Sequence, residues 1–272
     1  MRLFNTLNLD TDPRGVATLW LDRAEKNNAF NAVMVAELMA ALEQLRHRDD
    51  LRLLVLRGRG RHFSAGADLT WMLESAALSY ADNLADAHRL GELMAQLYSF
   101  PVPTLAVVQG AAFGGALGLI ACCDLAIGAT QAQFSLSEVR IGLVPAVIGP
   151  YVVRAIGERA ARRYALSAER FDGTRAQALG LLAECYPAAG LEQAMQQWVA
   201  NLLLNSPQAM RATKALLCEV SGGQVSTTLR ERCERCIADI RINSEGHEGL
   251  RAFLEKRPPA WQQLSDQGGA SQ

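Results

Sequence analysis

The segments FSAGAD at residues 63–68 and GAAFGGALG at residues 110–118 decide the fold class of this chain. Each follows an apolar run with strand character, LRLLVL at 51–56 and TLAVVQ at 104–109, and each leads into the start of a helix. Small residues allow a tight turn that brings backbone N–H groups close to a ligand. A strand, a small-residue turn and a helix in succession indicate parallel strands with crossover connections, and therefore an α/β domain.

Periodic segments on both sides extend this pattern. Apolar runs at 16–21 and 124–128 predict two more strands, and helical spacing predicts one helix that begins after Asn31 and another over residues 82–98. Beyond residue 151 the pattern is almost wholly helical. Helices are expected there at 159–166, 175–179, 191–204, 207–220, 227–242 and 245–256. The sequence therefore predicts a core over residues 1–200 and a C-terminal helical region over 201–264, followed by a disordered tail over 265–272.

The composition limits the possible partners. Half of the 272 residues are apolar, 20% are charged and the formal net charge is −1, which disfavours nucleic acid as a partner. The longest apolar stretch, 111–123, is shorter than the roughly 20 residues that a membrane span needs. No secretory signal begins the chain and the six cysteines show no disulfide framework, so we expect a cytoplasmic location without membrane contact. Cys233 and Cys236 have the spacing of half a metal site, but no second pair follows, and no metal is expected.

Two small-residue turns at the ends of neighbouring strands can hold one developing negative charge between two backbone amides. This arrangement lowers the barrier in acyl chemistry, although either turn alone is more often a packing device. A third segment, AQFSLSEVRIGLVPA at 132–146, places Glu138 among apolar neighbours. Burial of a carboxyl group raises its pKa, so Glu138 is a candidate for proton exchange near neutral pH.

Five motifs in this order resemble the enoyl-CoA hydratase/isomerase superfamily, also called the crotonase superfamily. They are EKNNAFN at 25–31, FSAGADL at 63–69, the run 109–124, AQFSLSEVRIGLVPA at 132–146 and EGLRAFLEKR at 248–257. The resemblance covers nearly the whole chain. It implies a crotonase-like ββα superhelix with a C-terminal helical trimerisation region, and a homotrimer or a dimer of trimers.

The resemblance also implies a site. The N–H groups of Ala67 and Gly115 would form the oxyanion hole for the thioester carbonyl, with Glu138 as the principal acid and base. Coenzyme A would enter as part of an acyl-CoA substrate, with no cofactor bound permanently. Further candidates for substrate binding are Lys26, Ala65, Asp68, Leu69, Trp71, Gly114, Gly118, Arg140 and Lys256. For Lys26 and for Lys256, which would reach the coenzyme of an adjacent subunit, a solvated lysine is the alternative.

The chain departs from the family pattern at one catalytic position. Typical hydratases of this family carry two glutamates, and Gly118 stands where the first is expected. A double-bond isomerase needs a single carboxylate, so the residues by themselves favour isomerisation. The segments FGGALGLIACCD at 113–124 and SEVRIGLVPAVI at 137–148 instead resemble the bacterial 3-methylglutaconyl-CoA hydratases of leucine catabolism and the isohexenylglutaconyl-CoA hydratases of acyclic terpene catabolism.

This resemblance predicts hydration of a branched, carboxylated enoyl-CoA. Arg140 is then the candidate partner of the distal carboxylate, through a bidentate pair. Two alternatives stay open. One is an isomerase that uses the same glutamate, and the other is a non-catalytic member that binds acyl-CoA or RNA.

Overall fold

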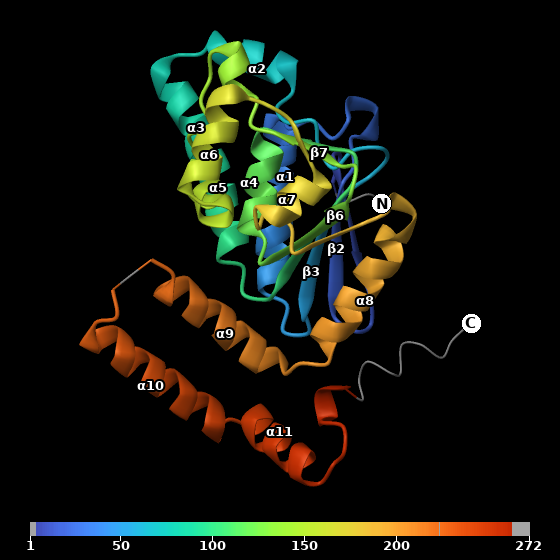
Figure 1. The fold of residues 1–272 in the computed structure, drawn as a ribbon, viewed down its shortest axis with the longest axis vertical. Coiled ribbons are helices and arrows are strands. Elements are labelled where there is room, and N and C mark those ends of the chain that lie inside the picture. Colours follow the sequence, from blue (N-terminus) through green and yellow to red (C-terminus); the bar gives the residue numbers. More distant parts are fainter. Residues whose placement is uncertain (1–3, 223, 263–272) are drawn as a thin grey trace.

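Two β-sheets organise the chain, which the computed structural model describes over residues 4–222 and 224–262 (Figure 1). The larger sheet has the strand order β1-β2-β3-β4-β6-β9, in which β1 is antiparallel to β2 and the other neighbours are parallel. Its strands are β1 (Leu7–Thr11), β2 (Val16–Leu21), β3 (Leu53–Gly58), β4 (Thr104–Val108), β6 (Leu125–Ala129) and β9 (Glu184–Tyr186). The smaller sheet has the order β5-β7-β8, formed by β5 (Ala111–Phe113), β7 (Gln133–Ser135) and β8 (Phe171–Asp172).

A repeated unit connects the two sheets. A strand of the larger sheet is followed by a short extended stretch in the second layer and then by a helix: β4, β5 and α4 (Gly115–Cys122), then β6, β7 and α5 (Gly149–Ile156). In two earlier units the extended stretch is a single bridging residue, Phe30 or Ser64. The helices of those units are α1 (Ala32–Arg46), and α2 (Leu69–Ala76) with α3 (Tyr80–Tyr98). The predicted ββα superhelix is thereby confirmed.

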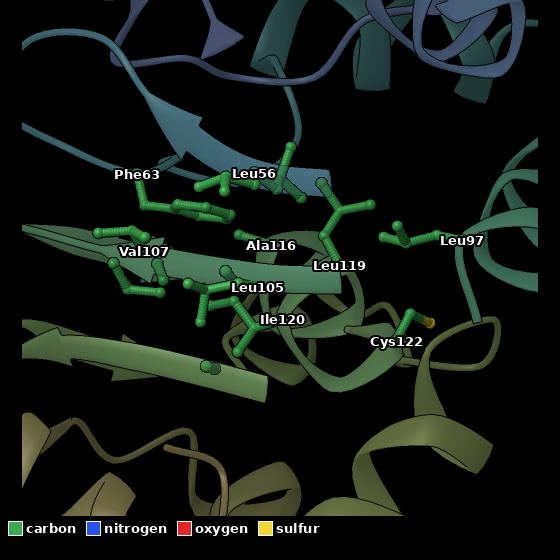
Figure 2. Packing of buried hydrophobic residues seen from close by; sticks show 14 of the residues in the cluster. Leu56, Phe63, Leu97, Leu105, Val107, Ala116, Leu119, Ile120 and Cys122 are labelled. Atoms are coloured by element: carbon green, nitrogen blue, oxygen red, sulfur yellow. The ribbon is translucent and has the colours of Figure 1, made fainter. Parts of the chain in front are cut away.

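Helix α4 lies inside the core, because six of its residues are buried. Figure 2 shows its side chains Ala116, Leu119 and Ile120 against the β-strand residues Leu56 and Leu105. A helix that is apolar on every side is stable only when it is covered on every side. The apolar stretch 111–123, which was too short for a membrane span, forms β5 and this buried helix.

Local sequence signals place most helix ends. The Asn31 side chain accepts a hydrogen bond from the Met34 N–H at 2.9 Å, which caps α1 as predicted.

The remaining helices are α6 (Glu158–Ser167), α7 (Gly173–Ala178), α8 (Leu191–Leu203), α9 (Pro207–Val220), α10 (Thr227–Ile242) and α11 (Ser244–Leu254). Three short 3₁₀ helices complete the set: η1 (Ala24–Lys26), η2 (Glu138–Ile141) and η3 (Ala188–Gly190).

The prediction of an almost wholly helical chain after residue 151 is wrong at two places. Strand β8 pairs with β7, and strand β9 extends the larger sheet beside β6. Both strands have only two or three residues, too few to show a strand period in the sequence.

The C-terminal helices lie apart from the rest of the chain. Helix α8, which contains the predicted boundary at residue 200, packs against β3, β6 and β9, whereas α9, α10 and α11 contact one another (Figure 1). Helix α9 is attached to the core by Lys214, whose Nζ lies 2.7 Å from Asp124 Oδ2 and 3.1 Å from the Val102 carbonyl oxygen.

No helix within the described ranges combines the length and apolarity needed to cross a bilayer. The predicted tail at 265–272 lies outside the described residues.

Candidate active site

Three successive ββα units each contribute one turn to the same place. Ala67 follows the second-layer residue Ser64, Gly115 follows β5, and Glu138 follows β7. Because the second-layer stretches pair with one another, the turns that leave them converge. The structure therefore brings together the three residues predicted to be catalytic.

The first turn requires a glycine at residue 66. Gly66 has φ +94°, and a β-carbon there would lie 2.9 Å from the Phe113 carbonyl oxygen. The Gly66 N–H donates to Ser64 Oγ at 3.2 Å. The next N–H, that of Ala67, has no acceptor among the described residues.

Asn28 holds this turn in place through hydrogen bonds, a role that the sequence did not indicate. Its buried side chain donates to the carbonyl oxygens of Arg59 and His62, both at 2.8 Å, and its own carbonyl accepts from Ser64 Oγ at 2.7 Å. Asn28 has φ 54°, a left-handed conformation that asparagine tolerates better than most residues. Asn28, the second asparagine of the motif EKNNAFN, thus holds the loop between β3 and the first turn in place.

The second turn presents another free amide. Gly114 has φ +52°, and its N–H donates to the Ser135 carbonyl oxygen at 2.9 Å. Gly115 is the first residue of α4, so no preceding helical turn supplies an acceptor for its N–H. The positive end of the α4 dipole adds to the attraction for an anion at this point.

Glu138 begins the 3₁₀ helix η2 and is half-buried. Its Oε2 atom is fully enclosed and has no hydrogen-bond partner among the described residues. Burial raises the pKa of Glu138 above its ordinary value of 4.5. A carboxyl group with a raised pKa keeps its proton to a higher pH than an exposed one does, which suits it to proton exchange with a bound molecule.

Two cavities meet at these three residues. The polar limb has a volume of about 320 Å³ and is lined by Ala65, Gly66, Ala67, Leu69, Met72, Phe113, Gly114, Gly115, Ser135, Ser137, Glu138, Arg140, Ile141 and Arg170. The apolar limb has a volume of about 290 Å³ and is lined by Phe30, Ala67, Trp71, Met72, Ala87, Leu90, Gly115, Glu138, Leu143, Val144, Pro145, Ala146, Val147 and Ile148. Both limbs share Ala67, Met72, Gly115 and Glu138, so a ligand held at the two amides has space on both sides.

Two arginines at the polar limb carry charges that no described acid neutralises. The Arg140 guanidinium donates to the Ala168 carbonyl oxygen at 3.0 Å, and the Arg170 guanidinium lies 5.1 Å from the centre of the Phe113 ring. Neither forms an ion pair with an acid among the described residues. Arg170 was not anticipated, because it reaches the site from the loop before β8, far from any motif in the sequence.

Several predicted substrate-binding residues line the limbs. Ala65, Leu69, Gly114 and Arg140 lie on the polar limb, and Trp71 lies on the apolar limb. Asp68 lines neither limb. Its carboxylate instead caps α2 by accepting from the Thr70 N–H at 3.0 Å and pairs with Arg23 at 3.1 Å.

Gly118, another predicted substrate-binding residue, lines neither limb. It is buried in α4, with Ile148 between it and the apolar limb. Lys26 is exposed and lies beside Asn27, whose carbonyl oxygen accepts from the Ala65 N–H at the edge of the polar limb. Lys256 follows α11, and α11 lies at the opposite end of the molecule from α2 and α3 (Figure 1).

Comparisons with known proteins agree with this geometry. The family model described as enoyl-CoA hydratase/isomerase matches residues 11–265. The chain belongs to the enoyl-CoA hydratase/isomerase family. The crystal structure of an enoyl-CoA hydratase from Shewanella pealeana is 47% identical, covers 95% of this chain and 97% of that chain, and has a TM-score of 0.91.

Curated relatives in the family include hydratases with named substrates. The 2,3-dehydroadipyl-CoA hydratase of Escherichia coli is 30% identical over 90% of this chain and 94% of its own length. The human mitochondrial methylglutaconyl-CoA hydratase is 29% identical over 93% of this chain and 76% of its own length. The predicted resemblance to the methylglutaconyl-CoA hydratase branch and the predicted enzyme class, a lyase of the enoyl-CoA hydratase type, are confirmed.

Proposed function

We propose that this hydratase adds water to an enoyl-CoA that is branched at its β-carbon and carries a carboxylate at its distal end, of the 3-methylglutaconyl-CoA or isohexenylglutaconyl-CoA type. The observation that carries the proposal is the position of Arg140 and Arg170. Both line the cavity that contains Glu138, and neither is paired with an acid among the described residues. The apolar limb on the other side of Glu138 offers space for a hydrocarbon branch.

In the proposed reaction the thioester oxygen accepts hydrogen bonds from the Ala67 and Gly115 amides. Glu138 takes one proton from a water molecule, and the water oxygen bonds to the β-carbon. The electrons of the double bond move to the α-carbon and the thioester oxygen, where the two amides stabilise the enolate. Glu138 then returns the proton to the α-carbon, so one water is consumed and the glutamate is restored.

The single carboxylate is sufficient for this sequence because it first removes and then delivers the same proton. Glu138 is the only acidic residue on either limb among the described residues. Loss of one oxyanion donor in such a site typically slows turnover by about 100–1000-fold. The substrates named for the two relatives support the acyl class, since methylglutaconyl and 2,3-dehydroadipyl are both acyl groups of dicarboxylic acids.

A pair of substrates tests the carboxylate directly. 3-Methylglutaconyl-CoA and 3-methylcrotonyl-CoA differ only in the distal carboxylate, and hydration of each is followed by loss of the conjugated thioester absorbance and by product mass. Arg140→Met should lower kcat/KM for the carboxylated substrate by up to about fivefold, since Arg140 is exposed and an exposed ion pair contributes up to about 1 kcal/mol, and should change the other substrate little. Arg154→Met is the matched control, because Arg154 is also exposed but bonds Tyr98 and lines neither limb.

The other outcomes of this assay separate the alternatives. An equal loss on both substrates in Arg140→Met would mean that the arginine serves the phosphates of the coenzyme. A product of unchanged mass with a shifted double bond would make the protein an isomerase. Tight binding of both thioesters without any product would support a non-catalytic member.

The proposal includes a homotrimer or a dimer of trimers in which Lys256 approaches the coenzyme bound to a neighbouring subunit. Within one chain Lys256 lies beyond α11, away from both limbs. Light scattering of the purified protein measures the assembly. A monomer that binds acyl-CoA at full affinity would contradict this part.

A further inference from the structure

Gly118 and Ile148 are packed against each other so closely that no side chain fits at residue 118. A β-carbon on Gly118 would lie 2.2 Å from Ile148 Cγ2 and 2.8 Å from Ile148 Cβ, and 3.2 Å from Met94 Sδ. Contacts under 3.0 Å are far inside van der Waals distance, and here the obstacle is the branched part of a buried side chain. Helix α4 therefore needs a glycine at the point where Ile148 rests on it.

Ile148 is also the last residue of the segment that lines the apolar limb. It is 3% exposed, immediately precedes α5 and takes part in the hydrophobic core cluster. One side of Ile148 thus faces the cavity beside Glu138, and another side faces α4. Its side chain separates the limb from the helix.

Val147, the residue before Ile148, packs against a glycine of another helix, α3. A β-carbon on Gly91 of α3 would lie 3.9 Å from Val147 Cγ1, an ordinary contact distance. The segment therefore rests on a glycine of α3 through Val147 and on a glycine of α4 through Ile148. Of the two, only the Gly118 contact leaves no space for a larger residue.

The consequence concerns the acyl group. The Ile148 side chain shortens the apolar limb, because it fills the space through which a longer acyl chain would extend toward α4. It also presents an apolar surface to the acyl group. We propose that Ile148 determines acyl-group specificity by closing the apolar limb against α4, so that of the two proposed acyl types the site selects the compact methyl-branched one over the isohexenyl-branched one. This inference rests on the proposed function only in assigning the acyl branch to the apolar limb.

A stability measurement tests the packing without any reaction. Gly118→Ala should lower the Tm by several degrees in the wild-type background. In the Ile148→Gly background, which removes the two shortest contacts, the same substitution should lower the Tm much less or raise it. Gly190→Ala, at a glycine with open space around it and not adjacent in sequence to Ile148, is the control and should behave alike in both backgrounds. Equal Tm losses for Gly118→Ala in both backgrounds would show that the two residues are not coupled.

Binding of saturated acyl-CoA thioesters with four to ten carbons, which cannot be hydrated, tests the specificity. Ile148→Ala should bind thioesters longer by two methylenes about 15-fold more tightly relative to the wild-type profile, since each newly buried methylene contributes about fourfold. Val153→Ala, on α5 outside both limbs and 40% exposed, is the control and should leave the profile nearly unchanged. An unchanged chain-length profile in Ile148→Ala would overturn the proposal whether or not the protein proves to hydrate carboxylated substrates.

Discussion

The Oε1 atom of Glu138 lies 3.2 Å from the position that a β-carbon on Gly114 would occupy. A side chain at residue 114 would therefore press against the carboxyl group, so the glycine leaves the space that Glu138 occupies beside the second turn. Gly114 also precedes the free amide of Gly115. The same glycine thus sets the position of the proposed acid and of one proposed oxyanion donor.

Gly114→Ala should lower kcat by roughly 10–100-fold, because a methyl group at 3.2 Å from Glu138 Oε1 displaces the carboxylate and strains the turn at φ +52°. The measurement is steady-state hydration together with the Tm. Gly157→Ala is the matched control, since Gly157 has φ +78° and nothing within 4 Å of a built β-carbon. That control should lose stability and keep kcat, and equal kcat losses in the two variants would remove the special role of Gly114.

Glu138→Gln should abolish nearly all turnover while acyl-CoA affinity changes little, because the amide keeps the shape and loses the proton chemistry. The expected loss is at least about 1000-fold, measured by single-turnover hydration and by calorimetric binding of a saturated thioester. A variant that kept full turnover would show that another group is the base.

The same substitution should stabilise the fold at neutral pH. Burial raises the pKa of folded Glu138 above its ordinary value of 4.5, so the folded state favours the protonated form. Wild-type stability is then lost as the pH rises from 4.5 through the raised pKa, and the loss is constant above it. The Tm of Glu138→Gln should match that of the wild type at low pH and exceed it at neutral pH. A gap that closes as the pH rises would contradict this assignment.

The dependence of kcat/KM on pH should show the titration of Glu138. Glu138 must be deprotonated to accept a proton from water, so kcat/KM should fall on the acid side with an apparent pKa above 4.5. A profile that is flat down to pH 4.5 would mean that burial does not govern the titration of this carboxyl group.

Removal of one partner of the Lys214–Asp124 pair should destabilise the protein strongly. The Lys214 side chain is 7% exposed, and Lys214→Met leaves Asp124 without its cation at the joint between α9 and the core. The expected loss is about 3–5 kcal/mol in urea unfolding, against less than 1 kcal/mol for Arg162→Met in the exposed Arg162–Glu158 pair. A loss similar to that of the surface pair would show that helix α9 is held by other contacts.

The sequence predicted those parts of the fold that repeat a long period or carry a local cap. Asn31 was predicted to cap α1, and the structure confirms it with the bond to Met34. Helices α9 and α10 begin and end at the predicted residues, because each has a serine before it and a long periodic face. Strands β8 and β9 were missed because two or three residues are too few to show a strand period.

The sequence predicted those parts of the site in which the backbone must form a tight turn of small residues. The two turns were identified from their small residues and Glu138 from its apolar surroundings, whereas Ala67 and Gly115 were named from the resemblance to the crotonase superfamily. The structure brings the three residues together. Arg170 and Ile148 could not be named, because an arginine before a two-residue strand and an isoleucine before a helix have no distinguishing pattern. Asp68 was assigned to the substrate, whereas its carboxylate is occupied by Arg23 and the start of α2.

The most direct test of the central claim is mass spectrometry of the product formed from 3-methylglutaconyl-CoA in ¹⁸O-labelled water. The wild-type protein should give a thioester that has gained one labelled water, and Glu138→Gln under the same conditions should give none above background. A wild-type product of unchanged mass, or equal label in both proteins, would contradict hydration by Glu138.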